Sequence, residues 1–206
     1  MGCLVEKEST VPDAYPLTRN ALRQACNQTS SRDPIVDFDD LTVQRAVDAL
    51  KARGIVRFVH PSHGERSTKF RHVLDEVLDL APPHVAVVAV LLLRGAQTSG
   101  ELRTRTERLH AFGSVEEVES VLAELATRDE ALAVELPRLA GQHQTRWVHL
   151  LCGPVDVDAL AAAAPPVAAA RTGVHPAAHD RVGALEAEVA QLRDRLDRIE
   201  RELGLS

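Results

Sequence analysis

The sequence has 206 residues, of which 45% are apolar and 26% are charged, and its formal net charge at pH 7 is −6. These values are ordinary for a globular protein and exclude wholesale disorder. The longest apolar run, residues 85–93, is far shorter than the roughly 20 residues of a membrane-spanning helix, so we expect no membrane association. Three cysteines without a CxxC pair or a recognisable signal peptide predict free thiols and a cytoplasmic location: Cys3, Cys26 and Cys152.

Three segments of the first half recur in the same order and at nearly constant spacing in the second half. The pairs are TRNALR (18–23) with TSGELR (98–103), ALKARGIV (49–56) with ELATRDEA (124–131), and KFRHVL (69–74) with RWVHLL (146–151). The spacing within the pairs drifts only as much as loops of different length would cause. We interpret the two halves as copies of one unit.

The first copy starts with an incomplete helix. Alignment of CLVEK (3–7) with VLLLR (90–94) implies that its first turn or two are absent, which predicts a start codon upstream of Met1. Helices are then predicted over 18–26 and 40–53, the second ended by Gly54. Strands follow at 55–59 and 68–73, on either side of the turn HPSHGE.

The second copy repeats this order. A helix over 82–94 begins with two prolines, which suit a helix start. The next two helices begin at capping boxes, TSGE at 98–101 and SVEE at 114–117. The spacing of apolar residues then changes to the alternation typical of strands, at 132–138 and 145–151. Three helices followed by a hairpin predict a winged helix-turn-helix in each copy.

The C-terminal quarter has a different composition. Residues 153–184 are rich in Ala and Pro and predict a linker, and residues 185–204 predict a helix with a heptad seam. The seam consists of Leu185, Val189, Leu192, Leu196, Ile199 and Leu203. Two interpretations remain open, since so short a seam could pair with a second copy in a homodimer or fold back onto the winged-helix units.

The predicted fold class is therefore α+β, mainly α with small β-hairpins. It comprises winged-helix domains over 1–78 and 80–152, the linker over 153–184 and the heptad helix over 185–204.

The motifs YPLTRNAL (15–22) and CNQTSSRDP (26–34) resemble the signature of the YceH family of bacterial proteins. The resemblance covers roughly residues 2–151. It implies tandem winged helices, often with a coiled-coil tail, and it supplies no catalytic residues and no established activity.

A winged helix commonly places its third helix in the major groove of double-stranded DNA. Residues 1–72 carry 11 Lys and Arg against 9 Asp and Glu, whereas residues 81–153 carry 7 against 9, so the first copy is the better candidate. Its candidate DNA contacts are Arg19, Asn20, Arg23, Arg32, Gln44, Arg45, Arg57, Arg66, Lys69 and Arg71. The polar turn at 27–34 is either a phosphate contact or only a solvated corner.

Carboxylates oppose this interpretation. Asp37, Asp39 and Asp40 stand at the start of the third helix of the first copy, and four glutamates lie on its counterpart: Glu116, Glu117, Glu119 and Glu124. The alternative is a module that binds another protein through apolar patches.

We find no motif of an enzyme and expect neither a catalytic residue nor a cofactor. A cluster near the first wing has no standard zinc spacing, so a polar surface hairpin is the preferred explanation over a metal site: His60, His63, Glu65 and His72. Phe70 and Trp147, at matching places in the two hairpins, are expected to pack each sheet on its helices.

Overall fold

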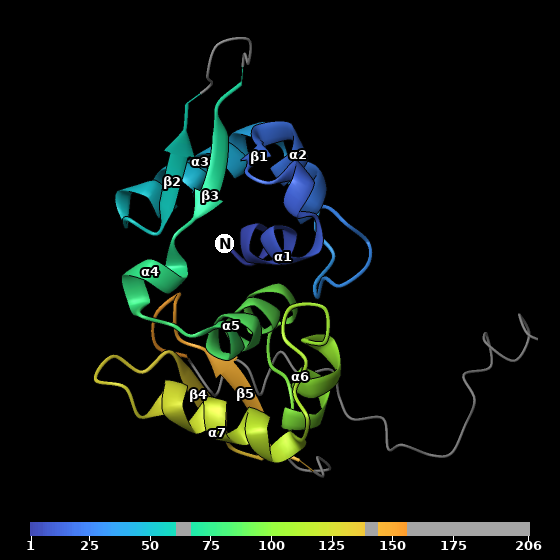
Figure 1. The fold of residues 1–206 in the computed structure, drawn as a ribbon, viewed down its shortest axis with the longest axis vertical. Coiled ribbons are helices and arrows are strands. Elements are labelled where there is room, and N and C mark those ends of the chain that lie inside the picture. The colour runs from blue at the N-terminus through green and yellow to red at the C-terminus, as the bar shows by residue number, and fades with distance from the viewer. Residues whose placement is uncertain (61–66, 139–143, 156–206) are drawn as a thin grey trace, which may run out of the picture. The chain divides into compact units, whose positions relative to one another are not determined.

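The first half of the chain alternates helices with the strands of one small sheet. The structure, a computed structural model, describes residues 1–60, 67–138 and 144–155. In this half the elements are α1 (Gly2–Thr10), the short 3-10 helix η1 (Pro12–Ala14), β1 (Leu17–Thr18), α2 (Arg19–Cys26), α3 (Asp40–Ala52), β2 (Val56–Val59) and β3 (Lys69–His72), as Figure 1 shows.

The second half repeats this order after a short connecting helix. Its elements are α4 (Leu74–Leu78), α5 (Pro82–Arg94), α6 (Ser99–Arg105), α7 (Val115–Ala126), β4 (Ala133–Leu136) and β5 (Arg146–His149). Helix α7 is the counterpart of α3, and the hairpin β4–β5 is the counterpart of β2–β3. These elements carry the segments that recur in the sequence.

The two sheets are built alike. In the first, antiparallel strands follow the order β1-β3-β2, and Leu17 of β1 lies opposite Phe70 of β3. In the second, β4 pairs with β5, and an isolated bridge joins Gln97 to Trp147. Leu17 directly precedes TRNALR, as Gln97 directly precedes TSGELR. Phe70 is the second residue of KFRHVL, as Trp147 is of RWVHLL. The bridge is therefore the counterpart of the β1–β3 pairing. The predicted α+β class with winged-helix units is confirmed.

Side-chain caps explain where the helices begin. Thr98 and Glu101 form the predicted capping box at α6, with both reciprocal hydrogen bonds present. At α7, Ser114 accepts the amide hydrogen of Glu117, but the carboxylate of Glu117 accepts from the amide of Gly113. The second capping box is therefore only half formed, because its carboxylate reaches one residue further back.

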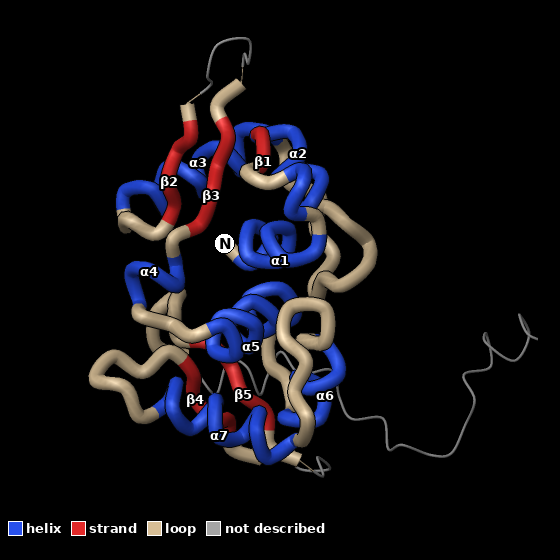
Figure 2. The backbone as a smooth tube through the Cα atoms, viewed as in Figure 1, coloured by secondary structure: helices blue, strands red, loops and turns tan. Residues whose placement is uncertain are grey.

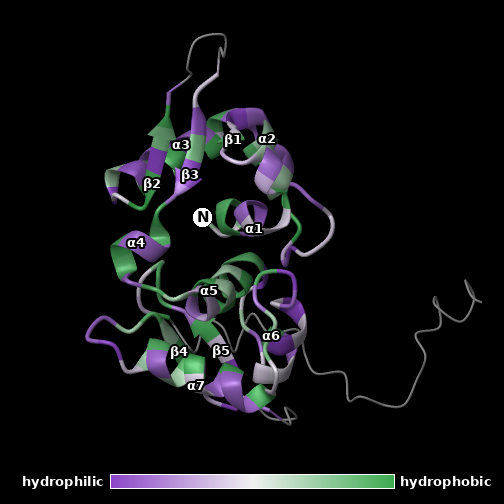
Figure 3. Ribbon diagram, in the orientation of Figure 1, coloured by the Kyte–Doolittle hydropathy of each residue, from purple (hydrophilic) through white to green (hydrophobic). Residues whose placement is uncertain are grey.

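Helix α1 belongs to both hydrophobic cores. Cys3 and Leu4 pack in the core of the first half, whereas Val5 packs with the buried side chains of α5 and α7. Leu93 of α5 in turn packs against the first core. Helix α5 is apolar around most of its surface, as Figure 3 shows, because it is covered by α1 on one side and by the second core on the other.

The described residues form one compact unit although they hold two cores. The proposed domain boundaries and the upstream start codon stay predictions. The linker from residue 156 onward and the whole heptad helix lie outside the described residues.

We predict unequal costs for removing the two matching aromatic side chains. Phe70 is 3% exposed, whereas Trp147 is only half-buried. Phe70→Ala should lower the free energy of unfolding by about 3–5 kcal/mol and Trp147→Ala by clearly less. Urea denaturation followed by circular dichroism measures both, and a Phe70→Ala protein as stable as the wild type would contradict the packing described.

Candidate functional site

The polar turn between α2 and α3 is fastened to the rest of the protein through Arg32, whose side chain is buried. Its guanidinium donates to both carboxylate oxygens of Glu6 on α1, at 3.0 and 2.7 Å. It also donates from Nε and Nη2 to the carbonyl of Ala25, at 3.1 and 2.7 Å. That carbonyl lies in the last turn of α2, where helix carbonyls lack partners of their own.

The same turn also reaches α5. The amide of Asp33 donates to the carbonyl of Leu93 at 3.0 Å, and Figure 2 shows the loop running past α1 toward α5. Arg32 is predicted to contact phosphate, whereas in the structure its donors are buried and already bonded within the chain. Through Arg32 and Asp33 the turn is a structural joint, although its other residues from Thr29 to Pro34 are exposed.

The Glu6–Arg32 pair sets the protonation of Glu6. Burial alone would raise the pKa of this carboxyl, but the hydrogen bonds and charge of Arg32 outweigh burial and lower it below the ordinary value of 4.5. Glu6 therefore stays ionised through the neutral range.

Four other members of the predicted DNA-contact set bind carboxylates of the same chain. Arg23 lies 3.1 Å from Asp40, and Gln44 donates to Asp48 at 3.0 Å. On the hairpin, Arg57 and Arg71 share Glu76 of α4, at 3.0 and 3.1 Å. These partners cancel much of the positive charge that a phosphate would meet.

Few basic side chains of the set remain available. Among the described members, Arg19 and Arg45 are exposed and make no ion pair. Asn20 is exposed and accepts from Arg23 at 3.3 Å, while Lys69 is half-buried on β3. Arg66 lies outside the described residues. The structure thus brings α2, α3 and the hairpin together as expected, with Arg19 and Arg45 as the exposed arginines of the described set that make no ion pair.

The approach to α3 instead exposes apolar side chains. Ile35, Phe38 and Leu41 are 60, 40 and 55% exposed, and we call them the α3 entrance. The side chain of Asn27 fixes the loop, because it accepts from the amide of Phe38 at 2.9 Å and donates to its carbonyl at 2.9 Å. The sequence held a signal for this surface in IVDFDDL, where apolar residues recur every third position.

Carboxylates surround the α3 entrance. Asp39 caps α3 by accepting from the amide of Thr42 at 2.7 Å, and the side chain and the amide of Thr42 together lower the pKa of Asp39. Asp37 and Asp40 stand on either side of it in the sequence. In the second half, the four predicted glutamates of α7 are all exposed: Glu116, Glu117, Glu119 and Glu124.

His72 differs from its prediction as part of a polar surface hairpin, because it is 3% exposed. Its Nε2 lies 2.6 Å from Glu8, its Nδ1 lies 3.4 Å from Asp75, and its amide donates to the Tyr15 hydroxyl at 2.8 Å. These contacts tie α1, β3 and α4 together. His63 and Glu65 lie outside the described residues, and within the described part no group of His, Cys, Asp and Glu suits a metal.

Comparison with known proteins gives the family. A family model described as "Protein of unknown function, DUF480" matches residues 1–142. The chain belongs to the DUF480 family.

Similar bacterial proteins support this assignment. The UPF0502 protein of Geobacter sulfurreducens is 46% identical over 192 residues, which covers 93% of this chain and 86% of the relative. The UPF0502 protein of Dechloromonas aromatica is 45% identical over 196 residues, with 94% and 89% covered. That of Pelobacter propionicus is 44% identical over 204 residues, with 98% and 90% covered. None of these names states an activity.

A further finding concerns membranes. Among the helices of this DUF480 protein that the structure describes, none has the length and apolar character needed to cross a bilayer.

We predict that Glu6→Gln changes the acid stability of the protein. Because the folded-state pKa of Glu6 is depressed, the pair stabilises the fold above about pH 4.5 and this contribution is lost as the pH falls through the lower folded-state pKa. The variant should be about 3 kcal/mol less stable at pH 7 and should lose less further stability on acidification. Urea denaturation across this pH range measures both effects. Glu119→Gln, at an exposed site, is the control, and equal acid sensitivity of Glu6→Gln and wild type would contradict the assignment.

Proposed function

We propose that this DUF480 protein is a non-enzymatic binding module that docks a protein segment on the α3 entrance. The observation that carries this proposal is the exposure of Ile35, Phe38 and Leu41 where a DNA-reading winged helix would present polar or basic side chains. Exposed apolar side chains rimmed by charge are typical of protein-binding surfaces.

The charge around the entrance specifies the partner further. Asp37, Asp39 and Asp40 flank the three apolar residues in the sequence, and Arg23 pairs with only the last of them. A partner segment with an apolar anchor flanked by Lys or Arg would therefore be complementary in both respects. Because Asn27 holds the loop in place, little ordering is needed on binding.

Double-stranded DNA is the second candidate, as expected for a transcription-regulator-like protein. A cavity of about 440 Å³ lies between α2, α3 and the sheet and is lined by Arg19, Asn20, Gln44 and Thr68, among others. Polar side chains of this kind contact phosphates. The carboxylates at α3 and the internal ion pairs of Arg23, Arg57 and Arg71 favour the protein partner.

Three further expectations belong to the proposal. The heptad seam forms a homodimer, the free cysteines favour a cytoplasmic location, and the motifs YPLTRNAL and CNQTSSRDP support a relationship to the YceH family.

We predict that Phe38→Asp abolishes partner binding. The tagged full-length chain is used to capture proteins from a bacterial extract, and the affinity of the captured protein is then measured with purified components. Phe38→Asp should weaken it at least tenfold, because a buried carboxylate replaces an apolar anchor. Val77→Asp, at an α4 side chain that is 50% exposed, is the matched control and should bind like the wild type.

Two outcomes would reject the protein-docking proposal. One is equal binding by Phe38→Asp and wild type. The other is tight binding of a fluorescent DNA duplex at low salt, where electrostatic attraction is strongest, together with its loss in Arg45→Glu.

We predict that the double variant Leu192→Asp with Leu196→Asp is a monomer. Two carboxylates in the seam would be buried in a coiled-coil dimer, which is costly. Sedimentation equilibrium of the full-length protein should give a dimer for the wild type and half that mass for the variant. A wild-type monomer would contradict the homodimer and favour a helix folded back on its own chain.

A further inference from the structure

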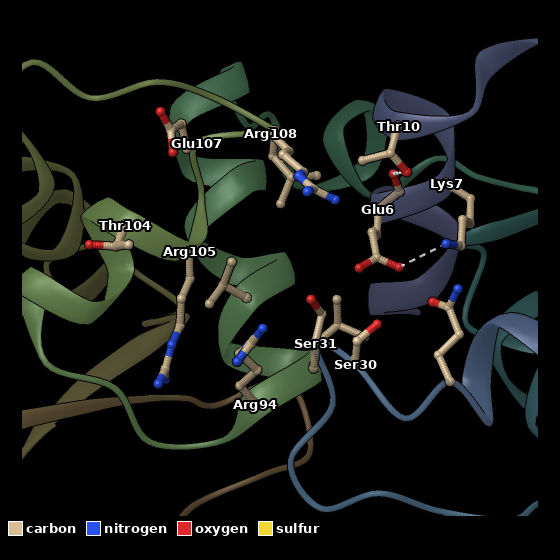
Figure 4. A pocket seen from close by; sticks show the side chains of 14 residues that line it. Glu6, Lys7, Thr10, Ser30, Ser31, Arg94, Thr104, Arg105, Glu107 and Arg108 are labelled. Atoms are coloured by element: carbon tan, nitrogen blue, oxygen red, sulfur yellow. Dashed lines mark hydrogen bonds and ion pairs between the residues drawn. The ribbon is translucent and has the colours of Figure 1, made fainter. Parts of the chain in front are cut away.

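A second surface, distinct from the α3 entrance, is a pocket of about 530 Å³ that we call the α1–α6 pocket. Its walls come from α1, the polar turn, α5, and α6 with the loop that follows (Figure 4). The side chains that matter here are Lys7, Arg94, Arg105, Arg108, Ser30 and Ser31. The volume lies within the range of sites for small molecules, roughly 300–1,000 Å³.

Positive charge predominates in the lining. Four basic side chains face two carboxylates, those of Glu6 and Glu107. The carboxylate of Glu6 already forms ion pairs with Arg32, at 2.7 Å, and with Lys7, at 3.5 Å. The carboxylate of Glu107 points away from the other labelled side chains in Figure 4. Little negative charge is left to balance the arginines.

Two of these arginines lack a protein partner. Arg105 lies 3.4 Å from Glu101, one helical turn earlier. By contrast, within the described residues neither Arg94 nor Arg108 makes an ion pair or a side-chain hydrogen bond. In Figure 4 the guanidinium group of Arg108 points toward α1, whereas that of Arg94 lies beside α5. They are free to bind a ligand.

Arg94 is held in an unfavourable setting. It is half-buried, and burial together with the nearby charges of Arg105 and Arg32 lowers the pKa of its guanidinium. Partly buried like charges repel each other, and an anion between them would relieve this repulsion. The charges of Glu6 and Asp33 act in the opposite direction, but they do not outweigh this electrostatic cost.

Hydrogen-bond donors complete the site. Ser30 and Ser31 bring two hydroxyl groups to the edge nearest Glu6 in Figure 4. Ser31 adopts a left-handed backbone conformation with φ of 58°, which is rare for a residue other than glycine. The bonds of Arg32 and Asp33 on its C-terminal side hold it there. Strain of this kind is common at functional sites.

We propose that the α1–α6 pocket binds a small anion that carries two or more phosphate charges. Arg94 and Arg108 provide charge-assisted hydrogen bonds, since the guanidinium fork matches phosphate oxygens, and the serine hydroxyls complete the coordination. A single carboxylate would leave part of this charge uncompensated. The phosphate groups can belong to a free inorganic anion or to a nucleotide, for which Val90, Leu93 and Leu109 offer an apolar wall.

Titration calorimetry of the full-length protein at low salt tests this proposal, with inorganic pyrophosphate and ADP as probes. We expect at least one probe to bind and to raise the melting temperature. Equal affinities would mean that the anion alone is recognised, and tighter binding of ADP would mean that the nucleoside contributes. Both results support the site.

Variants locate the binding. Arg94→Gln and the surface-exposed Arg108→Gln should each weaken it at least tenfold, whereas Arg53→Gln, at the exposed arginine that caps the end of α3, should not. The proposal is overturned if neither probe binds at millimolar concentration, or if Arg108→Gln binds like Arg53→Gln. Failure of the protein-docking test would not affect this result, because no residue of the α3 entrance lines the pocket.

Discussion

The guanidinium group of Arg32 donates hydrogen bonds to Glu6 of α1, to the carbonyl of Ala25 at the end of α2 and to the carbonyl of Ser31. Ser31 lies in the turn that leads to α3. Other features depend on the Arg32 side chain. It fixes α1, which contributes to both cores, and it holds the turn whose next amide bonds to α5. It also places Ser30 and Ser31 at the rim of the α1–α6 pocket. A buried charge is tolerated here because Glu6 neutralises it and the guanidinium nitrogens all have acceptors.

The protein uses many of its arginines for internal contacts. Arg23, Arg57 and Arg71 pair with carboxylates on neighbouring helices, so the face that would meet DNA in a winged-helix regulator has little free positive charge. Besides Arg19 and Arg45 on that face, arginines without an ion pair lie in the α1–α6 pocket. The winged-helix fold therefore favours DNA binding, whereas the surface charge does not. A function inferred from the fold alone would rest on analogy.

Local patterns in the sequence predicted most of the fold. The helix caps at Thr98 and Ser114, the stop at Gly54 and the repeat that pairs Phe70 with Trp147 all depend on residues close in sequence or on comparison of the two copies. The site was harder to predict, because its contacts join distant positions. Glu6 and Arg32 lie far apart in the sequence, and neither periodicity nor composition shows that a polar arginine will be buried.

Two further differences between the sequence-based predictions and the structure also come from contacts between residues that are distant in sequence. His72 was misjudged because its partners lie on α1 and α4. The short strand β1 and helix α4 were missed because pairing with β3 and packing in the second core, rather than local propensity, stabilise them.

A double-mutant cycle with Glu6→Gln, Arg32→Gln and the combined variant tests the central claim, that this pair joins the turn to α1. Urea denaturation at pH 7 gives the free energy of unfolding for all four proteins. If the pair is the joint described above, the two substitutions are strongly non-additive, with a coupling energy of about 2 kcal/mol or more. Effects that add within about 0.5 kcal/mol would show that the two side chains act independently and would contradict the account.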